Sequence, residues 1–226
     1  MKLKLYIGNR NYSSWSMRAW LLMRALGIAF DEVLLRLDFG DDSPFRRALA
    51  PVSPAGKVPV LVVDDFAVWD TLAIAETLHE RFPDKGVWPA DVRLRARARS
   101  LCSEMHAGFT ALRSHCAMNI EADLRDVGRR LWAEQLELRR DVARIDCIWS
   151  EPDGGGPYLF GAFGAADAFY APVCARFITY ALPLSEPARS YLESVTALPA
   201  YLEWARAARA EHDFLAAQEP YRTGRG

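Results

Sequence analysis

The most informative part of the chain is Lys57-Val58-Pro59-Val60-Leu61-Val62-Val63-Asp64-Asp65, with Trp69-Asp70-Thr71 a few residues later. This pattern predicts a strand, a tight turn, a second strand and the start of a helix. The presence of Pro59 in a predicted strand needs an explanation, because proline has no N–H to donate to a neighbouring strand. The local sequence favours a trans proline opening an edge strand, since cis bonds make up only about 5–6% of X–Pro bonds. A cis Val58–Pro59 bond would instead leave the backbone of Val58 free to pair with another molecule.

Strand and helix patterns alternate around this stretch. Apolar residues predict strands at 3–8, 28–36, 58–63 and 67–69, and helices at 15–27, 45–49 and 71–82. Strand–helix–strand units favour a parallel pair with a right-handed crossover, whereas the closing hairpin is antiparallel. Residues 1–83 are therefore expected to form an α/β domain around a small four-stranded sheet.

The rest of the chain has a different character. After a turn-rich linker at 84–90, the spacing predicts long helices at 91–119 and 122–150, a buried one at 167–182, and shorter ones at 186–195 and 198–210. Asp167 stands at the third position of the buried helix, where its side chain can form half of a capping box. We expect residues 91–226 to form an all-helical domain.

The composition is that of an ordinary globular protein. The chain has 226 residues, of which 51% are hydrophobic and 25% charged, and a formal charge of -1 that gives no electrostatic case for nucleic acid or an anionic membrane. No apolar run approaches the ~20 residues of a membrane span, and the N-terminus does not resemble a signal peptide. The four cysteines lack zinc-ligand spacing, so we expect reduced thiols, no metal and a cytoplasmic location.

Ser13 and Ser14 precede the first helix and allow two interpretations. A serine there is a natural N-cap, whose oxygen accepts an N–H from the first turn. Alternatively, one hydroxyl lies beside an anion that the helix N-terminus attracts. No His/Asp arrangement is evident that would make either serine a nucleophile. A serine without a base can still donate a hydrogen bond to a thiolate.

Asp70 and Thr71 stand at the start of the next long helix. Either side chain can cap the helix. An acid and a hydroxyl at this position could also hold the ammonium and carboxylate groups of an amino-acid-like ligand. Alone, the pair does not distinguish these roles.

In combination these motifs resemble those of the cytosolic glutathione transferases. Ser13-Ser14-Trp15-Ser16 resembles the motif of serine-type classes, most closely the zeta class, and residues 54–61 resemble the segment that holds the family's cis-proline. Residues 69–74 stand where the family has a Glu/Gln–Ser pair, and residues 164–167 resemble the capping box of its buried helix. Residues 104–109 and 112–114 further resemble bacterial members. The resemblance covers nearly the whole chain and implies a thioredoxin-like domain followed by an all-helical domain.

The resemblance also implies a glutathione site. Val58, before a cis Pro59, would pair its backbone with the cysteinyl part of glutathione as an added strand does. Asp70 and Thr71 would hold the γ-glutamyl end, and Lys57 would lie near the glycyl carboxylate. These roles make cis the better prediction for the Val58–Pro59 bond.

The sulfur of glutathione would receive a hydrogen bond from Ser13 or Ser14, with Tyr12 as a rival donor. Lowering a thiol pKa of ~8.5 by ~2 units needs about 2.7 kcal/mol of preference for the thiolate. One charge-assisted hydrogen bond of ~1.5–3 kcal/mol, together with the helix terminus, can supply that preference. No general base is required.

Some residues depart from the family pattern. The zeta motif has cysteine where this chain has Trp15, which puts zeta-type cis–trans isomerase activity in doubt. Asp70-Thr71 is shorter and differently branched than the usual Glu–Ser pair. Gly164 replaces the usual Ser/Thr cap, at a cost of only a few tenths of a kcal/mol.

We therefore predict a homodimeric glutathione transferase that uses glutathione as co-substrate against a small, partly apolar electrophile. The electrophile would bind between the domains, beside the helix that holds Met105 and Phe109. Two alternatives remain. One is a non-catalytic transferase-like binding or regulatory protein, and the other is a glutathione-dependent isomerase, resembling maleylacetoacetate isomerase, or a dehalogenase.

Overall fold

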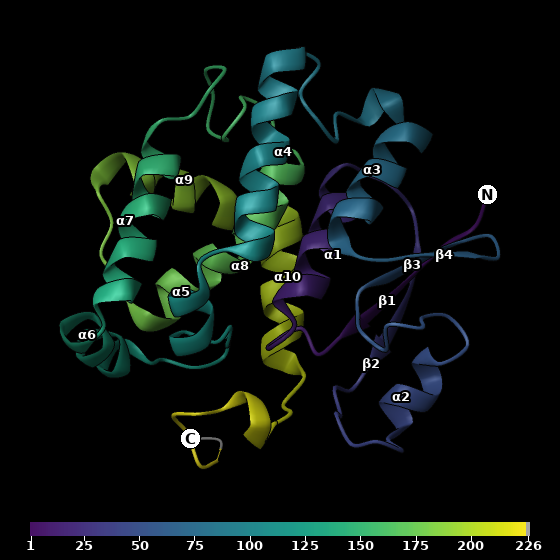
Figure 1. Cartoon of the computed structure of the whole chain (residues 1–226), viewed down its shortest axis with the longest axis horizontal. Coiled ribbons are helices and arrows are strands. Elements are labelled where there is room, and N and C mark those ends of the chain that lie inside the picture. The colour runs from purple at the N-terminus through teal and green to yellow at the C-terminus, as the bar shows by residue number, and fades with distance from the viewer. Residues whose placement is uncertain (225–226) are drawn as a thin grey trace.

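The fold combines a small mixed sheet with a larger set of helices, as predicted from the sequence (Figure 1). It was obtained as a computed structural model that describes residues 1–224. We call residues 1–83 the sheet half and residues 91–224 the helical half. Figure 1 shows the sheet half on the right and the helical half on the left and centre.

The sheet has four strands in the order β2-β1-β3-β4. The strands are β1 (Leu3–Gly8), β2 (Asp31–Leu35), β3 (Val60–Val63) and β4 (Phe66–Val68). β1 pairs with β2 in parallel and with β3 antiparallel, and β3 pairs antiparallel with β4. The predicted parallel unit and closing hairpin are therefore confirmed. The predicted strand at 28–36 is shorter in the structure, and the one at 58–63 begins only at Val60.

Three helices accompany the sheet: α1 (Ser14–Ala25), α2 (Pro44–Leu49) and α3 (Thr71–Arg81), and a 3-10 turn follows at Pro83–Lys85. α1 is buried on nearly every side because it contacts β1, α3, α8 and α10. Most of its buried residues are apolar, but Ser14, Ser16 and Arg18 are buried as well. α2 packs on the other face of the sheet, where Phe45 and Leu49 join a small apolar cluster with Tyr12 and Leu215.

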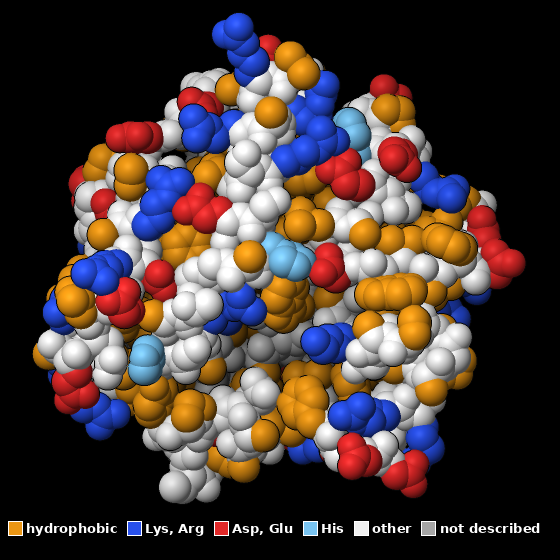
Figure 2. All heavy atoms as spheres, viewed as in Figure 1, with side chains coloured by type: hydrophobic (Ala, Val, Ile, Leu, Met, Phe, Trp, Pro, Cys, Tyr) orange, Lys and Arg blue, Asp and Glu red, His pale blue; other side chains and the backbone are white. Residues whose placement is uncertain are grey.

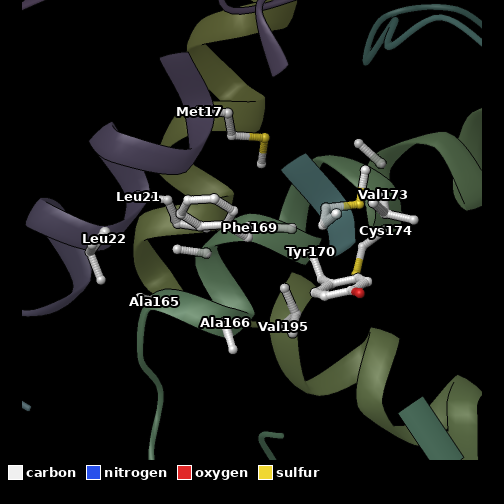
Figure 3. Packing of buried hydrophobic residues seen from close by; sticks show 14 of the residues in the cluster. Met17, Leu21, Leu22, Ala165, Ala166, Phe169, Tyr170, Val173, Cys174 and Val195 are labelled. Carbon is white, nitrogen blue, oxygen red and sulfur yellow. The ribbon is translucent and has the colours of Figure 1, made fainter. Parts of the chain in front are cut away.

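The helical half is built around α8 (Ala165–Tyr180). The other helices are α4 (Val92–Ala107), α5 (Thr110–His115), α6 (Arg125–Glu134), α7 (Leu136–Ser150), α9 (Glu186–Thr196) and α10 (Pro199–Ala210), followed by a 3-10 turn at Ala216–Gln218. Figure 3 shows Phe169 and Tyr170 of α8 among buried side chains that include Met17 and Leu21 of α1. One apolar core therefore continues from the sheet half into the helical half.

The long helix predicted at 91–119 is wrong as a single element. It ends at Ala107, and α5 begins after Phe109, which has a left-handed backbone with φ 53°. A Cβ on Gly108 would lie 2.7 Å from the carbonyl oxygen of Glu104, so the turn requires glycine. Met105, Phe109 and Leu112 remain buried on both sides of the break, which explains why their spacing suggested one helix.

The helix predicted at 122–150 is also two helices in the structure. Gln135 has an extended backbone, with φ -105° and ψ 99°, and separates α6 from α7. Leu131 and Leu138 are buried on either side of it, so the apolar spacing again continues across the break.

The start of α8 confirms the predicted capping box. Asp167 Oδ2 accepts a hydrogen bond from the Gly164 N–H at 2.9 Å, while Oδ1 accepts from the Leu159 N–H at 3.0 Å and from the Tyr191 hydroxyl at 3.1 Å. Burial raises the pKa of the Asp167 carboxyl to about 6. A Cβ on Gly164 would lie 3.1 Å from the Val87 carbonyl oxygen, so the linker packs tightly where the family has Ser or Thr.

In residues 1–224 no helix is long and apolar enough to cross a membrane. Within the same range no group of three or more His, Cys, Asp or Glu side chains is arranged to hold a metal ion. Cys102, Cys116 and Cys174 are buried free thiols, as expected, whereas Cys147 is exposed.

Candidate functional site

A cleft of about 1010 Å³ lies between the two halves of the molecule. Its walls are the residues Tyr12–Trp15, Leu37, Phe39, Phe45, Arg46, Ala55–Pro59, Trp69, Asp70, His106, Thr110, Arg113, Ser114, Ala117, Met118, Arg176 and Gln218. Figure 2 shows basic, acidic and histidine side chains around the hollow between the halves. The cleft thus brings together residues that are far apart in the sequence.

Ser13 is the N-cap of α1 and also faces the cleft. Its Oγ accepts a hydrogen bond from the Ser16 N–H at 3.4 Å and donates to Ser16 Oγ at 2.8 Å. Ser16 Oγ in turn accepts from the Gly8 N–H at 3.0 Å. Ser13 therefore caps the helix and borders the cleft, but in this structure its one hydroxyl proton is donated to Ser16 Oγ.

Ser14 is the first residue of α1 and is held by a cation. Its Oγ accepts a hydrogen bond from Nη2 of Arg176 at 3.3 Å. Arg176 comes from α8 and is buried, with Nε donating to the Cys116 carbonyl and Nη1 to the Pro172 carbonyl. Burial lowers the pKa of the Arg176 guanidinium to about 10. Because Ser14 Oγ accepts from Arg176, its own hydroxyl proton is available to a group in the cleft.

Two more arginines lie beside the ring of Trp15, the residue that follows these serines. Arg18 stacks between the rings of Trp15 and Phe169, with its guanidinium carbon 4.1 Å and 5.0 Å from the ring centroids. Arg113 lies 5.3 Å from the centroid of Trp15 and donates to the carbonyl oxygens of His106 and Gly108. Burial, reinforced by Arg176 and Arg113, lowers the pKa of Arg18 to about 9. This part of the molecule therefore has an excess of positive charge.

Tyr12 lines the cleft, but its hydroxyl is bonded elsewhere. The hydroxyl donates toward Glu219 Oε1 at 2.7 Å and the Asp213 carbonyl oxygen at 3.1 Å, and it accepts from the Leu215 N–H at 3.4 Å. Burial and the bond to Glu219 raise the pKa of Tyr12 to about 12. The Tyr12 hydroxyl proton is thus donated within the C-terminal segment and not to a ligand in the cleft.

The residues before β3 form the opposite wall. Lys57, Val58 and Pro59 all line the cleft, and the Val58–Pro59 bond is cis, which confirms that prediction. The pairing of β1 with β3 runs from Leu3↔Val63 to Tyr6↔Val60, so Val58 lies beyond the end of the ladder. Its backbone is therefore placed at a free end of the sheet beside the cleft.

Asp70 and Thr71, at the start of α3, have different surroundings. Asp70 lines the cleft, caps the helix through Oδ1 to the Leu72 N–H at 3.2 Å, and places Oδ2 3.3 Å from Nε2 of His106. Thr71 is buried at 2% exposure and is absent from the cleft lining. Of the predicted pair, only Asp70 reaches the space that a ligand would occupy.

Met105 and Phe109 do not line the cleft. They are 1% and 6% exposed and belong to the apolar core, where Phe109 packs against Tyr170. The same helices instead present His106, Thr110 and Arg113 to the cleft. The helical wall is accordingly more polar and more basic than the sequence suggested.

Sequence reasoning missed the cationic residues of this wall. Arg176 left a signal, because it is a basic residue within an otherwise apolar buried helix. Arg113 left none, since an arginine on an amphipathic helix is usually solvent-exposed.

In sequence and fold the chain is similar to known glutathione transferases. The family model described as "Glutathione S-transferase, N-terminal domain" matches residues 12–81. Glutathione S-transferase Z1 of Arabidopsis thaliana is 28% identical over 88% of this chain and 90% of that protein. Maleylacetoacetate isomerase of Pseudomonas aeruginosa is 29% identical over 52% of this chain and 55% of that protein. A Burkholderia glutathione transferase homologue solved with bound glutathione has a TM-score of 0.64 and 24% identity, covering 93% of this chain and 100% of that one.

Proposed function

We propose that the chain is a member of the glutathione S-transferase family, near its zeta class, and that it activates glutathione as a thiolate for attack on a small electrophile. The observation that carries this proposal is the meeting of Ser13, Ser14, Val58 and Asp70 on a single cleft. These side chains and backbone groups come from the ends of separate elements of the sheet half.

Glutathione would lie along the wall formed by the sheet half. The free backbone of Val58 pairs with its cysteinyl part, as an added strand does. Asp70 binds the γ-glutamyl ammonium, and Lys57 lies near the glycyl carboxylate. Thr71 contributes to the helix start, from its buried position.

The thiolate would be stabilised at the N-terminus of α1. Ser13 and Ser14 border the cleft, and the Arg176 guanidinium leaves the Ser14 proton free to point at the sulfur. The helix terminus and the nearby arginines favour an anion there. A hydrogen bond of about 1.5–3 kcal/mol to a charged acceptor is of the size needed to lower a thiol pKa by ~2 units.

The second substrate would lie against the helical wall. Arg113, Arg176 and His106 replace the apolar lining that was expected, which favours an electrophile that bears a carboxylate. Ala117 and Met118 leave room for a partly apolar body.

A glutathione-dependent cis–trans isomerase is the second candidate. A maleyl compound carries a carboxylate, so the basic helical wall supports this reaction as well as transfer. Trp15, at the place of the zeta-class cysteine, weighs against it. The non-catalytic alternative predicts glutathione binding without turnover of any acceptor.

The protein would act as a cytoplasmic homodimer with no nucleic-acid, membrane or metal partner.

Glutathione binding and thiol ionisation test the proposal directly. We expect glutathione to bind, and the thiolate absorbance of the complex to titrate well below that of free glutathione. Ser13→Ala and Ser14→Ala identify the donor by the size of the shift that each abolishes. If neither substitution changes the titration, the serine mechanism is wrong. Absence of glutathione binding at millimolar concentration would reject the proposed function itself.

A further inference from the structure

The chain that follows α10 has no counterpart among the predicted site elements, yet it touches the loop that carries the serines. We call residues 9–14 the serine loop. Figure 1 shows the C-terminal segment below α10, near the lower ends of both halves. Glu211 accepts hydrogen bonds from the Arg10 N–H at 2.7 Å and the Asn11 N–H at 3.3 Å, and Asp213 accepts from Asn9 Nδ2 at 3.1 Å. The C-terminal segment therefore holds the beginning of the serine loop.

Glu219 makes the densest set of contacts in this segment. Its carboxylate is buried at 4% exposure and accepts hydrogen bonds from the Tyr12 hydroxyl at 2.7 Å and from Asn119 Nδ2 at 2.9 Å and 2.8 Å. Arg222 donates to the same carboxylate from Nε at 2.8 Å and from Nη2 at 2.5 Å. A buried carboxylate with this many donors is satisfied on both oxygens.

These contacts join the serine loop to the helical half. Asn119 Oδ1 accepts from Asn11 Nδ2 at 2.9 Å, and Asn11 Oδ1 accepts from the Glu121 N–H at 2.9 Å. Glu219 thus contacts Tyr12 on one side and Asn119 on the other, within one buried network. Residues 116–121, which include cleft residues Ala117 and Met118, are tied to the serine loop through it.

Movement of Tyr12 would be transmitted to the serines. The Ser14 N–H donates to the Tyr12 carbonyl at 3.0 Å, and the Ser13 N–H donates to the Asn9 carbonyl at 2.8 Å. Both ends of this turn are thus fixed by partners of the C-terminal segment. Gln218, next to Glu219, also lines the cleft.

We propose that Glu219 is a positioning residue, which holds the serine loop in register with the helical wall so that a serine hydroxyl meets the glutathione sulfur. The inference rests on the proposed function for its chemistry, and on the buried network for its geometry. A carboxylate is needed because Tyr12, Asn119 and Arg222 all donate, and a glutamine would offer one acceptor oxygen in place of two.

Glu219→Gln tests this role with little change in shape. We expect the pKa of the bound glutathione thiol to rise, and kcat to fall by between about 10- and 100-fold, as expected when reacting groups are misplaced by an ångström. KM for glutathione should change less, because Val58, Asp70 and Lys57 are untouched. Tyr12→Phe, which removes the hydroxyl that bonds Glu219, the Asp213 carbonyl and the Leu215 N–H, should reproduce part of the effect. Glu203→Gln is the matched control, since Glu203 forms an exposed two-bond ion pair with Arg24 away from the cleft.

Amide hydrogen exchange of residues 9–14 separates this proposal from the proposed function, because it needs no glutathione. Faster exchange in Glu219→Gln than in Glu203→Gln supports positioning even where the wild-type protein binds no glutathione. If Glu219→Gln fails to fold, amide hydrogen exchange and the thiol pKa with kcat are measured on Tyr12→Phe instead. Unchanged exchange, or unchanged thiol pKa and kcat in a folded variant, would overturn the inference.

Discussion

Arg18 is buried with little to neutralise it. Its exposure is 2%, and within residues 1–224 its Nε and Nη1 atoms have no hydrogen-bond partner. The faces of Trp15 and Phe169 offset part of the cost of removing this cation from water. The lowered pKa of about 9 still leaves the guanidinium charged at neutral pH. Such a buried charge lowers the free energy of unfolding, but it stabilises a nearby anion.

Arg18→Met should separate these two effects. We expect the free energy of unfolding at neutral pH to rise by about 1–3 kcal/mol, because methionine fills the space without an unsatisfied buried charge. The pKa of bound glutathione should rise at the same time, since a positive charge is lost near the thiolate. Chemical denaturation and the thiolate titration measure the two quantities. A variant that is less stable, with an unchanged thiol pKa, would show that Arg18 serves only packing.

Arg113→Ala tests the preference for a carboxylate. We expect KM for an acceptor that bears a carboxylate to rise about 10-fold, the equivalent of ~1.4 kcal/mol, while a neutral acceptor is affected less. Steady-state kinetics with a matched acid and amide measure the difference. Arg125→Ala is the control, because Arg125 is exposed beside Asp123. Equal losses for both acceptors would assign Arg113 to packing against Trp15.

The two helix starts at α4 and α8 use aspartate in different surroundings. Asp91 caps α4 at the surface, accepting from the Arg93 and Leu94 N–H groups, whereas Asp167 is buried at 1% exposure. Asp167→Ala should lower the free energy of unfolding by about 3 kcal/mol, because it leaves several buried donors unsatisfied. Asp91→Ala should cost only ~1 kcal/mol. Urea unfolding compares them, and equal costs would mean that burial adds nothing.

The pH dependence of stability should also reveal Asp167. Its pKa in the folded state is raised from 3.8 to about 6, so the folded state binds an extra proton between these values. The contribution of this group to the free energy of unfolding therefore falls as pH rises from about 4 to 6. Asp167→Ala should lose that slope, and Asp91→Ala should keep it. A wild-type slope retained in Asp167→Ala would place the titration on another group.

Gly128 lets α6 approach the end of α8. A Cβ at this position would lie 1.8 Å from the Tyr180 carbonyl oxygen, so no side chain fits without moving a helix. Gly128→Ala should lower the free energy of unfolding by about 3 kcal/mol or more. Arg129→Ala, at the exposed next position, should change it by only ~0.5 kcal/mol. Similar thermal shifts for both variants would contradict the close approach.

Features carried by adjacent residues could be predicted from the sequence. The serine N-cap and the aspartate at the start of α3 each follow from local chemistry. The cis Val58–Pro59 bond does not, because the local sequence favours trans and the cis prediction came from the family resemblance. The breaks at Gly108–Phe109 and Gln135 could not, because apolar residues keep helical spacing across them. The place of Arg113 could not be predicted either, since it depends on how the break after α4 turns α5 and so brings Arg113 beside Trp15. The contacts of Glu219 with Tyr12 could not be predicted either, because these residues are far apart in the sequence and no local pattern indicates the contact.

At the scale of the molecule, the two halves share one apolar core. Met17 and Leu21 of α1 pack with Phe169 of α8, so neither half buries its own apolar surface alone (Figure 3). We expect one cooperative unfolding transition, with equal calorimetric and van't Hoff enthalpies. The fragment 1–83 should not fold alone, because α1 would expose the face that α8 covers. Two resolved calorimetric transitions, or a folded fragment, would contradict this.

The turn at Gly108–Phe109 has a consequence for how such a protein can diversify. Around it, Met105 and Phe109 are buried in the core, whereas His106, Thr110 and Arg113 line the cleft. Neighbouring residues are therefore constrained differently, the first two by packing and the other three by ligand binding. Mutations on the cleft wall can alter acceptor preference while the core face preserves folding. Randomising positions 106, 110, 113 and 114 together should therefore yield libraries rich in folded variants with new selectivities. Ser13 and Ser14 of the sheet half, which we propose activate the thiol, would stay unchanged in such libraries.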